Sequence, residues 1–380
     1  MKITKIRIDC LSVPLRHPYR LCREYGVLPA TTPVIVSVFT DEGITGYGEC
    51  NPWPRFTGDS AEICALTLEK HIAPAVIGLD PTNINAIHRA MDEAIRGQHL
   101  TKAAVDIACH DVWGKSENVP VCRLLGGELR KGMRCMWAVG GAEPEVNALQ
   151  VLEAKQKGYD GCMIMIGGED WKHDAARTAA IREAVGPDFP LIVDANQGWD
   201  VDTAVRYWKQ IRHLDILFFE QPVQSWDVQG MAEVRRRIDI PVSADESVVT
   251  LRDARNLVEA GAADVFSIKV AKNGGIKPAR ELCDYADASG VQIFFNSMIE
   301  EGISEAASLQ LGVTRPRVFA GIGHAYFSPN RLDGDICSYH EQIHPESGES
   351  ILSDLPGLGV KLDEAAMKRY TTDTRTVAEV

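Results

Sequence analysis

Three carboxylates and one lysine recur at nearly equal intervals in the second half of the sequence, and together they could support metal-assisted acid–base chemistry. They are Asp194, Glu220, Asp245 and Lys269, separated by 26, 25 and 24 residues. Carboxylates gathered in a partly dry cavity repel one another, and a divalent cation removes that penalty. An all-oxygen ligand set suits Mg²⁺, with Mn²⁺ as the second choice, better than Zn²⁺. The alternative is that these acids are helix N-caps or ion-pair partners, but the even spacing favours a metal site.

Each interval corresponds to one strand–helix unit. From about residue 133 short apolar runs alternate with amphipathic segments, and we expect strands at 134–139, 162–166, 191–195, 216–220, 240–245, 264–269 and 291–295. Seven or eight such units predict an α/β protein with a parallel sheet that closes into a (β/α)8 TIM-type barrel. A doubly wound open sheet is the structural alternative, although no G-x-G-x-x-G follows the early strands. In a barrel, the three acids and the lysine would meet at the C-terminal mouth.

The first third of the chain has a different pattern. Alternating strands at 32–40 and 41–50, joined by a turn at 41–43, precede helical segments at 60–78 and 101–118. We expect residues 1–128 to form most of an α+β capping domain and 129–357 the barrel with the catalytic site. The segment 358–380 breaks the strand–helix rhythm, and we expect it to return to the capping domain.

The composition of the chain argues against several kinds of partner and location. The chain of 380 residues has a formal net charge of −13, which argues against nucleic acid or an anionic membrane as a partner. No apolar run is as long as a membrane span, and the N-terminus lacks a signal-type apolar core. Ten cysteines without a C-x-x-C pair indicate reduced packing residues and a cytoplasmic protein.

Motifs across nearly the whole chain resemble the mandelate racemase/muconate lactonizing enzyme family of the enolase superfamily, in particular its muconate-lactonizing branch. These motifs are GITGYGEC, AAVDIACHDVWGK, CRLLGG, VDANQGW, FFEQPV, SADES, IKVAKNGGI and PGLGVKLDE. The resemblance implies a barrel capped by a domain built from both termini, and a homo-oligomer. It also implies Mg²⁺ on Asp194, Glu220 and Asp245, with the carboxylate of a small-molecule substrate bound to that metal.

Removing the proton next to a carboxylate creates an ene-diolate that is too unstable in water to form readily. A divalent ion on both oxygens lowers this barrier, and a lysine or histidine takes the proton. Lys269, at a strand tip, fits the base, although it could instead pair with Asp245. Lys272 is expected to be structural.

The sequence departs from the family's pattern at the end of the second barrel strand. Related enzymes usually carry Lys-x-Lys there, whereas this chain has Met163 and Met165. Methionine has no proton to exchange, so the substrate face opposite Lys269 lacks its expected acid–base group. This favours a one-face reaction such as elimination by a dehydratase or lyase, in a pocket that prefers apolar or cationic groups. The alternatives are an epimerase or racemase, a cycloisomerase, or a non-catalytic metal-stabilised barrel in which the methionines are filler.

Further residues are candidates for substrate contact. Segments 18–26 and 51–58 resemble the family's two cap loops, which close over the substrate and exclude water. From these loops, from the second barrel strand and from positions near the other expected strand ends, we expect substrate contacts. The residues are Arg20, Tyr25, Trp53, Met163, Met165, Asn196, Glu300 and His324. Glu300 could equally give polar support. His324 could be a structural histidine or the missing second acid. The HEQIH string at 340–344 is a chance match to the zinc motif, because Pro345 follows at once.

Overall fold

The computed structural model describes residues 1–22, 25–168, 170–319, 322–325, 331–339, 342–344 and 349–379. Its centre is a ring of parallel strands: β6 (Gly132–Gly140), β7 (Cys162–Met165), β8 (Leu191–Asp194), β9 (Phe219–Glu220), β10 (Val242–Ala244), β11 (Val265–Ile268), β12 (Gln292–Phe295) and β13 (Ile322–Ala325). Each strand pairs with the next along the chain, and β13 pairs with β6. The sheet is therefore a closed eight-stranded barrel, as the sequence predicts, and the open-sheet alternative is excluded.

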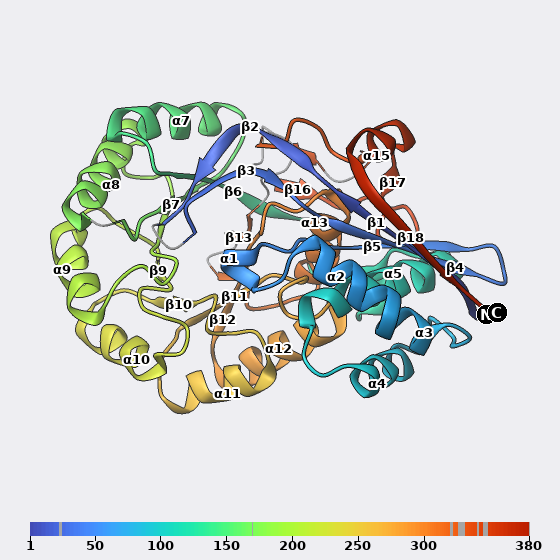
Figure 1. Cartoon of the computed structure of the whole chain (residues 1–380). Coiled ribbons are helices and arrows are strands. Elements are labelled where there is room, and N and C mark those ends of the chain that lie inside the picture. Colours follow the sequence, from blue (N-terminus) through green and yellow to red (C-terminus); the bar gives the residue numbers. More distant parts are fainter. Residues whose placement is uncertain are drawn as a thin grey trace.

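Helices connect the barrel strands and surround them on the outside (Figure 1). They are α7 (Pro144–Gln156), α8 (Trp171–Val185), α9 (Val201–Ile211), α10 (Val228–Arg237), α11 (Leu251–Glu259), α12 (Ile276–Ser289) and α13 (Gly302–Gly312). The side chains of Asp170, Asp200 and Asp227 accept backbone N–H bonds at the starts of α8, α9 and α10. The acids that cap these helices are therefore not Asp194, Glu220 and Asp245. Those three are left for another role.

The capping domain contains an antiparallel sheet of the order β18-β1-β4-β5, from β1 (Ile3–Leu11), β4 (Val34–Thr40), β5 (Thr45–Cys50) and β18 (Thr371–Ala378). The first and last strands pair, so both chain ends lie together (Figure 1). Helix α5 (His99–Ser116) packs so closely on β5 that a Cβ at Gly48 would lie 1.8 Å from the Ala104 carbonyl oxygen. This contact explains why the GITGYGEC segment needs glycine.

Smaller elements complete the cap. The hairpin β2 (Val13–Arg20) and β3 (Val27–Thr31) is followed by α1 (Pro54–Thr57), α2 (Ala61–Thr67), η1 (Leu68–Ile72), α3 (Ala73–Val76), α4 (Ile84–Ala94) and α6 (Val121–Leu124). Near the C-terminus lie β14 (Cys337–Tyr339), β15 (Gln342–His344), β16 (Glu349–Ile351), β17 (Lys361–Leu362) and α15 (Glu364–Tyr370). The described part of the HEQIH string, 342–344, is a strand paired with β16, not the helix a zinc motif requires.

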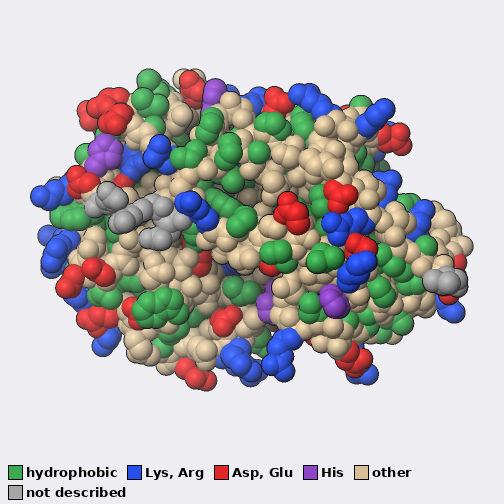
Figure 2. Space-filling view, viewed as in Figure 1, with side chains coloured by type: hydrophobic (Ala, Val, Ile, Leu, Met, Phe, Trp, Pro, Cys, Tyr) green, Lys and Arg blue, Asp and Glu red, His purple; other side chains and the backbone are tan. Residues whose placement is uncertain are grey.

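The charged side chains and the cysteines lie where the composition leads one to expect them, on the surface and in the interior respectively. Acidic and basic side chains are interspersed over the face shown in Figure 2. All ten cysteine side chains are buried. Within the described ranges, the helices include none that is both long and apolar enough to cross a membrane.

Candidate active site

The barrel brings the three acids and the lysine to one mouth. Asp194 ends β8, Glu220 ends β9, Asp245 follows β10 directly, and Lys269 follows β11. These strands are neighbours in the sheet, and Asp194 is paired in register with Glu220. All four side chains are buried, with Lys269 the most exposed at 5%. The equal spacing in the sequence therefore corresponds to one step around the barrel for each residue.

Burial and neighbouring charges shift the pKa values of the three carboxylates, two of them upward. Burial and the neighbouring Glu220 raise the pKa of Asp194 well above its usual range. Burial and Asp245 raise the pKa of Glu220 to about 8. Burial also acts to raise the pKa of Asp245, but Lys269 and Lys272 outweigh it, and the net shift is downward. Buried acids that disfavour one another's ionisation are the set that a divalent cation would relieve.

The donor set fits a hard cation chemically, because every candidate ligand is a carboxylate oxygen. Among the described residues, however, no three acidic, histidine or cysteine side chains already form a group that could hold an ion. The two lysine amines take up both Asp245 carboxylate oxygens instead. Asp194, Glu220 and Asp245 could hold Mg²⁺ once these amines give up that carboxylate.

Two lysines approach Asp245, but they differ in what else they contact. The Lys269 Nζ lies 2.5 Å from Asp245 Oδ2, and the Lys272 Nζ lies 2.6 Å from Oδ1. Lys272 also donates to the backbone carbonyls of Asp245 and Ser267, which gives it the structural role expected from the sequence. Lys269 instead lines the cavity at the barrel mouth. Burial acts to lower the pKa of Lys269, but Asp245 and Glu246 outweigh it and raise it, so the ion pair considered as an alternative is present.

Aromatic side chains of the capping domain cover this cavity. The ring centroid of Tyr25 lies 5.4 Å from that of Trp53 and 5.5 Å from that of Phe56. The Lys269 Nζ lies 4.4 Å from the Phe56 ring centroid. The Tyr25 hydroxyl donates to Glu246 Oε1 over 2.6 Å. The predicted contacts Tyr25 and Trp53 therefore lie at the cavity, where they exclude water from the lysine.

The structure brings some of the other predicted residues to the cavity and not others. Asn196 lines it and donates to Asp194 from both its backbone and its side-chain nitrogen. Glu300 is buried but accepts from Ser297 Oγ and Met298 N, which supports the loop after β12 and matches the alternative of polar support. His324 lies in β13, paired with Phe295, but its side chain falls outside the described part.

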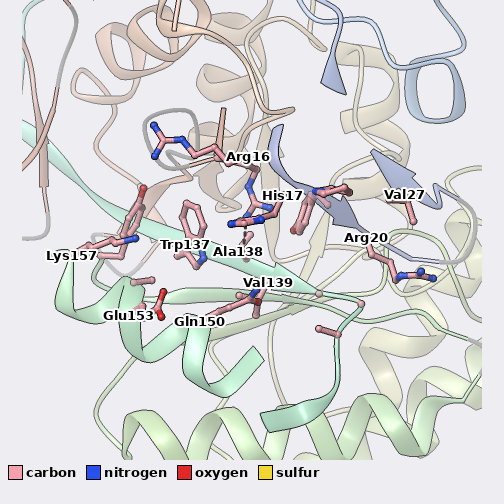
Figure 3. A pocket seen from close by; sticks show the side chains of 18 residues that line it. Arg16, His17, Arg20, Val27, Trp137, Ala138, Val139, Gln150, Glu153 and Lys157 are labelled. Atoms are coloured by element: carbon pink, nitrogen blue, oxygen red, sulfur yellow. Dashed lines mark hydrogen bonds between the residues drawn. The ribbon is translucent and has the colours of Figure 1, made fainter. Parts of the chain in front are cut away.

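Arg20 lies in a separate cleft on the outer side of β2, with a volume of about 590 Å³. Figure 3 shows its side chain extending away from Trp137 at the other end of that cleft. It does not line the cavity beside Lys269. The expected direct contact with substrate therefore stays a prediction without structural support.

The two methionines of β7 differ in whether their side chains reach the cavity. Met165 lines the cavity, whereas Met163 is 1% exposed and does not reach it. Strands β7 and β11 lie on opposite sides of the eight-membered ring, since four steps separate them in either direction. Met165 therefore forms a wall across from Lys269, and Met163 is packing beneath it.

Three residues at the site escape the sequence reasoning. Asn296, one residue past β12, donates to Glu220 Oε1 over 2.7 Å, and the strand-end rule that found Lys269 would have found it. Glu246 follows Asp245 directly, and the Asp194 pKa responds to its charge. Tyr19 lines the cavity from the cap hairpin, where no strand-end pattern points to it.

A buried cluster in the cap holds the loop that carries Lys269. Asp106 of α5 accepts from the backbone N of Ile276 over 2.5 Å, and His88 Nε2 lies 2.6 Å from its other oxygen. His110 Nδ1 lies 3.3 Å from Asp106. A Cβ at Gly275, whose φ is +111°, would lie 2.3 Å from the same carboxylate. The AAVDIACHDVWGK motif thus ties the capping domain to the loop after β11.

Replacing this anchor should cost stability in a defined pH window. Burial acts to raise the pKa of Asp106, but His110 and His88 outweigh it and lower it, and the pKa of His110 is raised despite its burial. The contribution of Asp106 to the free energy of unfolding is lost as pH falls below about 4. The contribution of His110 is lost as pH rises beyond about 6.5. We expect Asp106→Asn to lower the free energy of unfolding by about 3 kcal/mol between those values, measured by urea denaturation. Asp202→Asn, at the surface pair with Arg237, is the control. An equal effect of both changes would contradict the anchor role.

Sequence comparison identifies the family. Residues 3–126 match the family described as "Mandelate racemase / muconate lactonizing enzyme, N-terminal domain". Residues 147–366 match "Enolase C-terminal domain-like". This chain belongs to the mandelate racemase/muconate lactonizing enzyme family of the enolase superfamily. The resemblance seen in its motifs is confirmed.

Relatives within the family are isomerases. An N-succinyl-L-Arg/Lys racemase of Bacillus cereus is 35% identical over 375 residues, 98% of either chain. Muconate cycloisomerase 1 of Rhodococcus opacus is 32% identical over 378 residues, 98% of this chain and 99% of the relative. The crystal structure of a dipeptide epimerase from Enterococcus faecalis, complexed with Mg and the dipeptide L-Leu-L-Tyr, matches with a TM-score of 0.88 and 30% identity. That match covers 95% of this chain and 99% of the epimerase.

These relatives establish an enzyme of the enolase superfamily and exclude the non-catalytic alternative. They also favour the isomerase alternative over the elimination that the methionine pair suggests. Substitution of an acid–base pair at one strand is therefore not by itself evidence for a lyase.

Proposed function

We propose that this enzyme is a Mg²⁺-dependent isomerase that takes the proton from the carbon next to a carboxylate, with Lys269 as the base. The observation that carries the proposal is the position of the Lys269 amine. It lies in a buried cavity, beside three carboxylates at the ends of adjacent strands. Bound Mg²⁺, held by Asp194, Glu220 and Asp245, would supply the positive charge that stabilises an ene-diolate.

The chain's own residues then have distinct tasks. Lys269 accepts the proton, and the aromatic cover of Tyr25, Trp53 and Phe56 excludes water from it. Asn296 and Asn196 orient Glu220 and Asp194 through hydrogen bonds of 2.7 Å. Among the substrates that the relatives' names suggest, we favour N-acylated amino acids and dipeptides. The cavity combines polar groups that can take a carboxylate and an amide with an apolar part of the lining made of Leu21, Trp53, Phe56, Met165, Met298 and Ile299.

A second candidate is a cycloisomerase of the muconate type. The Met165 wall favours it, because cycloisomerisation needs only one acid–base group. The relative from Rhodococcus opacus carries that name. In this case Lys269 would exchange its proton with the product rather than invert a stereocentre.

The test is α-proton exchange in heavy water with Mg²⁺ present. N-succinyl-L-arginine, N-succinyl-L-lysine, L-Ala-L-Glu and cis,cis-muconate would be incubated with the enzyme and followed by ¹H NMR and mass spectrometry. We expect deuterium at the carbon next to the carboxylate of at least one amino-acid compound, and no exchange after chelation with EDTA. Lactone formation from muconate without exchange on the others would favour the second candidate. Inertness of all four compounds would contradict the proposal.

A further inference from the structure

The hydroxyl of Tyr19 is buried at the cavity without a hydrogen-bond partner among the described residues. The side chain is 5% exposed and comes from strand β2 of the cap hairpin. The other hydroxyl groups at the cavity are engaged, since Tyr25 donates to Glu246 and Ser297 donates to Glu300. An unpartnered buried hydroxyl costs free energy in the resting protein. A bound substrate would be the partner that recovers this cost.

Tyr19 lies against the β6 side of the barrel, whereas Lys269 follows β11. The Arg331 guanidinium carbon lies 3.8 Å from the Tyr19 ring centroid and 4.6 Å from that of Trp137 in β6. Its Nη2 donates to the Ala138 carbonyl of the same strand over 2.6 Å. Strand β6 adjoins β7, so Tyr19 lies beside the Met165 wall, across the ring from β11. Tyr19 and Met165 line the same cavity, so the Tyr19 side chain is available on the side where the family's second acid–base residue is missing.

The surroundings keep this hydroxyl protonated and also stabilise its anion. Burial raises the pKa of Tyr19, and the Arg331 charge is the largest influence in the opposite direction. The resting side chain is therefore a neutral phenol with a proton to give. A phenolate formed during turnover would lie beside a buried guanidinium, which stabilises it electrostatically.

We propose that Tyr19 is the catalytic acid on the substrate face opposite Lys269, which makes inversion at the α-carbon available to this enzyme. The inference rests on the proposed function. Lys269 takes the α-proton, so that the C–H bond breaks and its electrons enter the ene-diolate. The Tyr19 O–H bond then breaks, its proton forms a new C–H bond on the other face, and a phenolate remains. In the reverse direction, the phenolate is the base and the Lys269 ammonium is the acid.

The Tyr19 ring also lies between two spaces. It lines both the inner cavity and the outer cleft of Figure 3, whose wall includes the exposed Arg16 and His17. This position puts one residue, Tyr19, between the reaction cavity and a solvent-filled cleft.

The test separates inversion from exchange. Both enantiomers of N-succinyl-arginine would be incubated in heavy water with Mg²⁺ and with wild-type, Tyr19→Phe or Tyr285→Phe enzyme. Phenylalanine keeps the ring that stacks on Arg331, and Tyr285 on α12 outside the barrel is the matched control. L-Ala-L-Glu and its epimer L-Ala-D-Glu would be tested in parallel.

We expect Tyr19→Phe to slow inversion by about 10²–10⁴-fold, while the enantiomer that faces Lys269 still exchanges its α-proton with retention at a rate within a few-fold of wild type. A structural role would lower both rates together, so an equal loss overturns the inference, as does unchanged inversion. Thermal unfolding of each variant checks that it is folded. Exchange absent from the wild-type enzyme on both compound pairs would overturn the proposed function, and the inference with it.

Discussion

Lys269→Met is expected to reduce α-proton exchange on the enantiomer whose α-proton faces Lys269 by about 10⁴-fold, at the upper end for a general base. Methionine preserves the length of the side chain and its contact with Phe56 but has no proton-accepting amine. Loss of this base stops proton removal from the Lys269 face, so exchange with retention on that enantiomer should disappear, and inversion, which needs both faces, should disappear in either direction. Deuterium incorporation measured by mass spectrometry detects both.

The matched control is Lys277→Met. Lys277 lies on α12, paired with Glu281 on the surface, so the same substitution there tests for loss of a lysine in general. Lys277→Met should exchange at the wild-type rate. If Lys269→Met retains more than about a tenth of the wild-type exchange rate on the enantiomer that faces Lys269, the base on that face is another residue. Circular dichroism would show that the variant is folded.

Glu220→Gln should stabilise the metal-free protein at high pH and should lose part of that advantage when Mg²⁺ is added. In the metal-free protein, Glu220 has a pKa raised to about 8 by burial and Asp245. The folded state therefore favours the protonated carboxyl. The contribution of this group to the free energy of unfolding is full below the ordinary carboxylate pKa and is lost as pH rises through about 8. At pH 8.5 without metal, the glutamine variant should therefore be more stable than wild type. Glutamine also keeps an oxygen for the bonds from Ser267 and Asn296.

With excess Mg²⁺ the stability advantage of the glutamine variant over wild type should shrink. A ligand that binds only the folded state stabilises it by about 2.7 kcal/mol at a hundred times its Kd. Loss of one carboxylate ligand should weaken Mg²⁺ binding at least tenfold, which removes about 1.4 kcal/mol of that stabilisation. Urea denaturation with and without Mg²⁺ gives both values, and exchange activity should fall in parallel. Glu233→Gln, on the surface of α10, is the control. A variant whose Mg²⁺ stabilisation equals that of wild type would remove Glu220 from the metal site.

The barrel could be predicted because its signal is local. Each strand is a short apolar run, and a fixed interval places Asp194, Glu220, Asp245 and Lys269 at strand ends without any knowledge of long-range contacts. The same rule would have found Asn296. The closing pair β13–β6 needs no further signal, because eight units in order leave few other arrangements.

Residues that reach the site from the cap could not be found in this way. Tyr19 and Arg20 are adjacent in β2, so their side chains point to opposite faces of the hairpin. Only the three-dimensional position of the hairpin shows that Tyr19 reaches the cavity and Arg20 the outer cleft. Likewise, the Asp106 anchor joins residues 170 positions apart. Such long-range pairs have no periodic signature in one sequence.

The expectation of a lyase shows the limit of reasoning from one missing group. Met163 and Met165 carry no exchangeable proton, and of the two expected contacts only Met165 lines the cavity. The step from an inert strand to a one-face reaction assumes that no other element supplies a proton. A hairpin from another domain can do so, and the sequence around the methionines carries no trace of it.

The pairing of β1 with β18 has a consequence for biosynthesis. Strand β1 has only β4 beside it until β18 has been synthesised, whereas every barrel strand precedes β18 in the chain. The barrel strands are thus all made before the sheet of the capping domain can be completed. During synthesis, the strands that carry the site are in place before the domain that covers it.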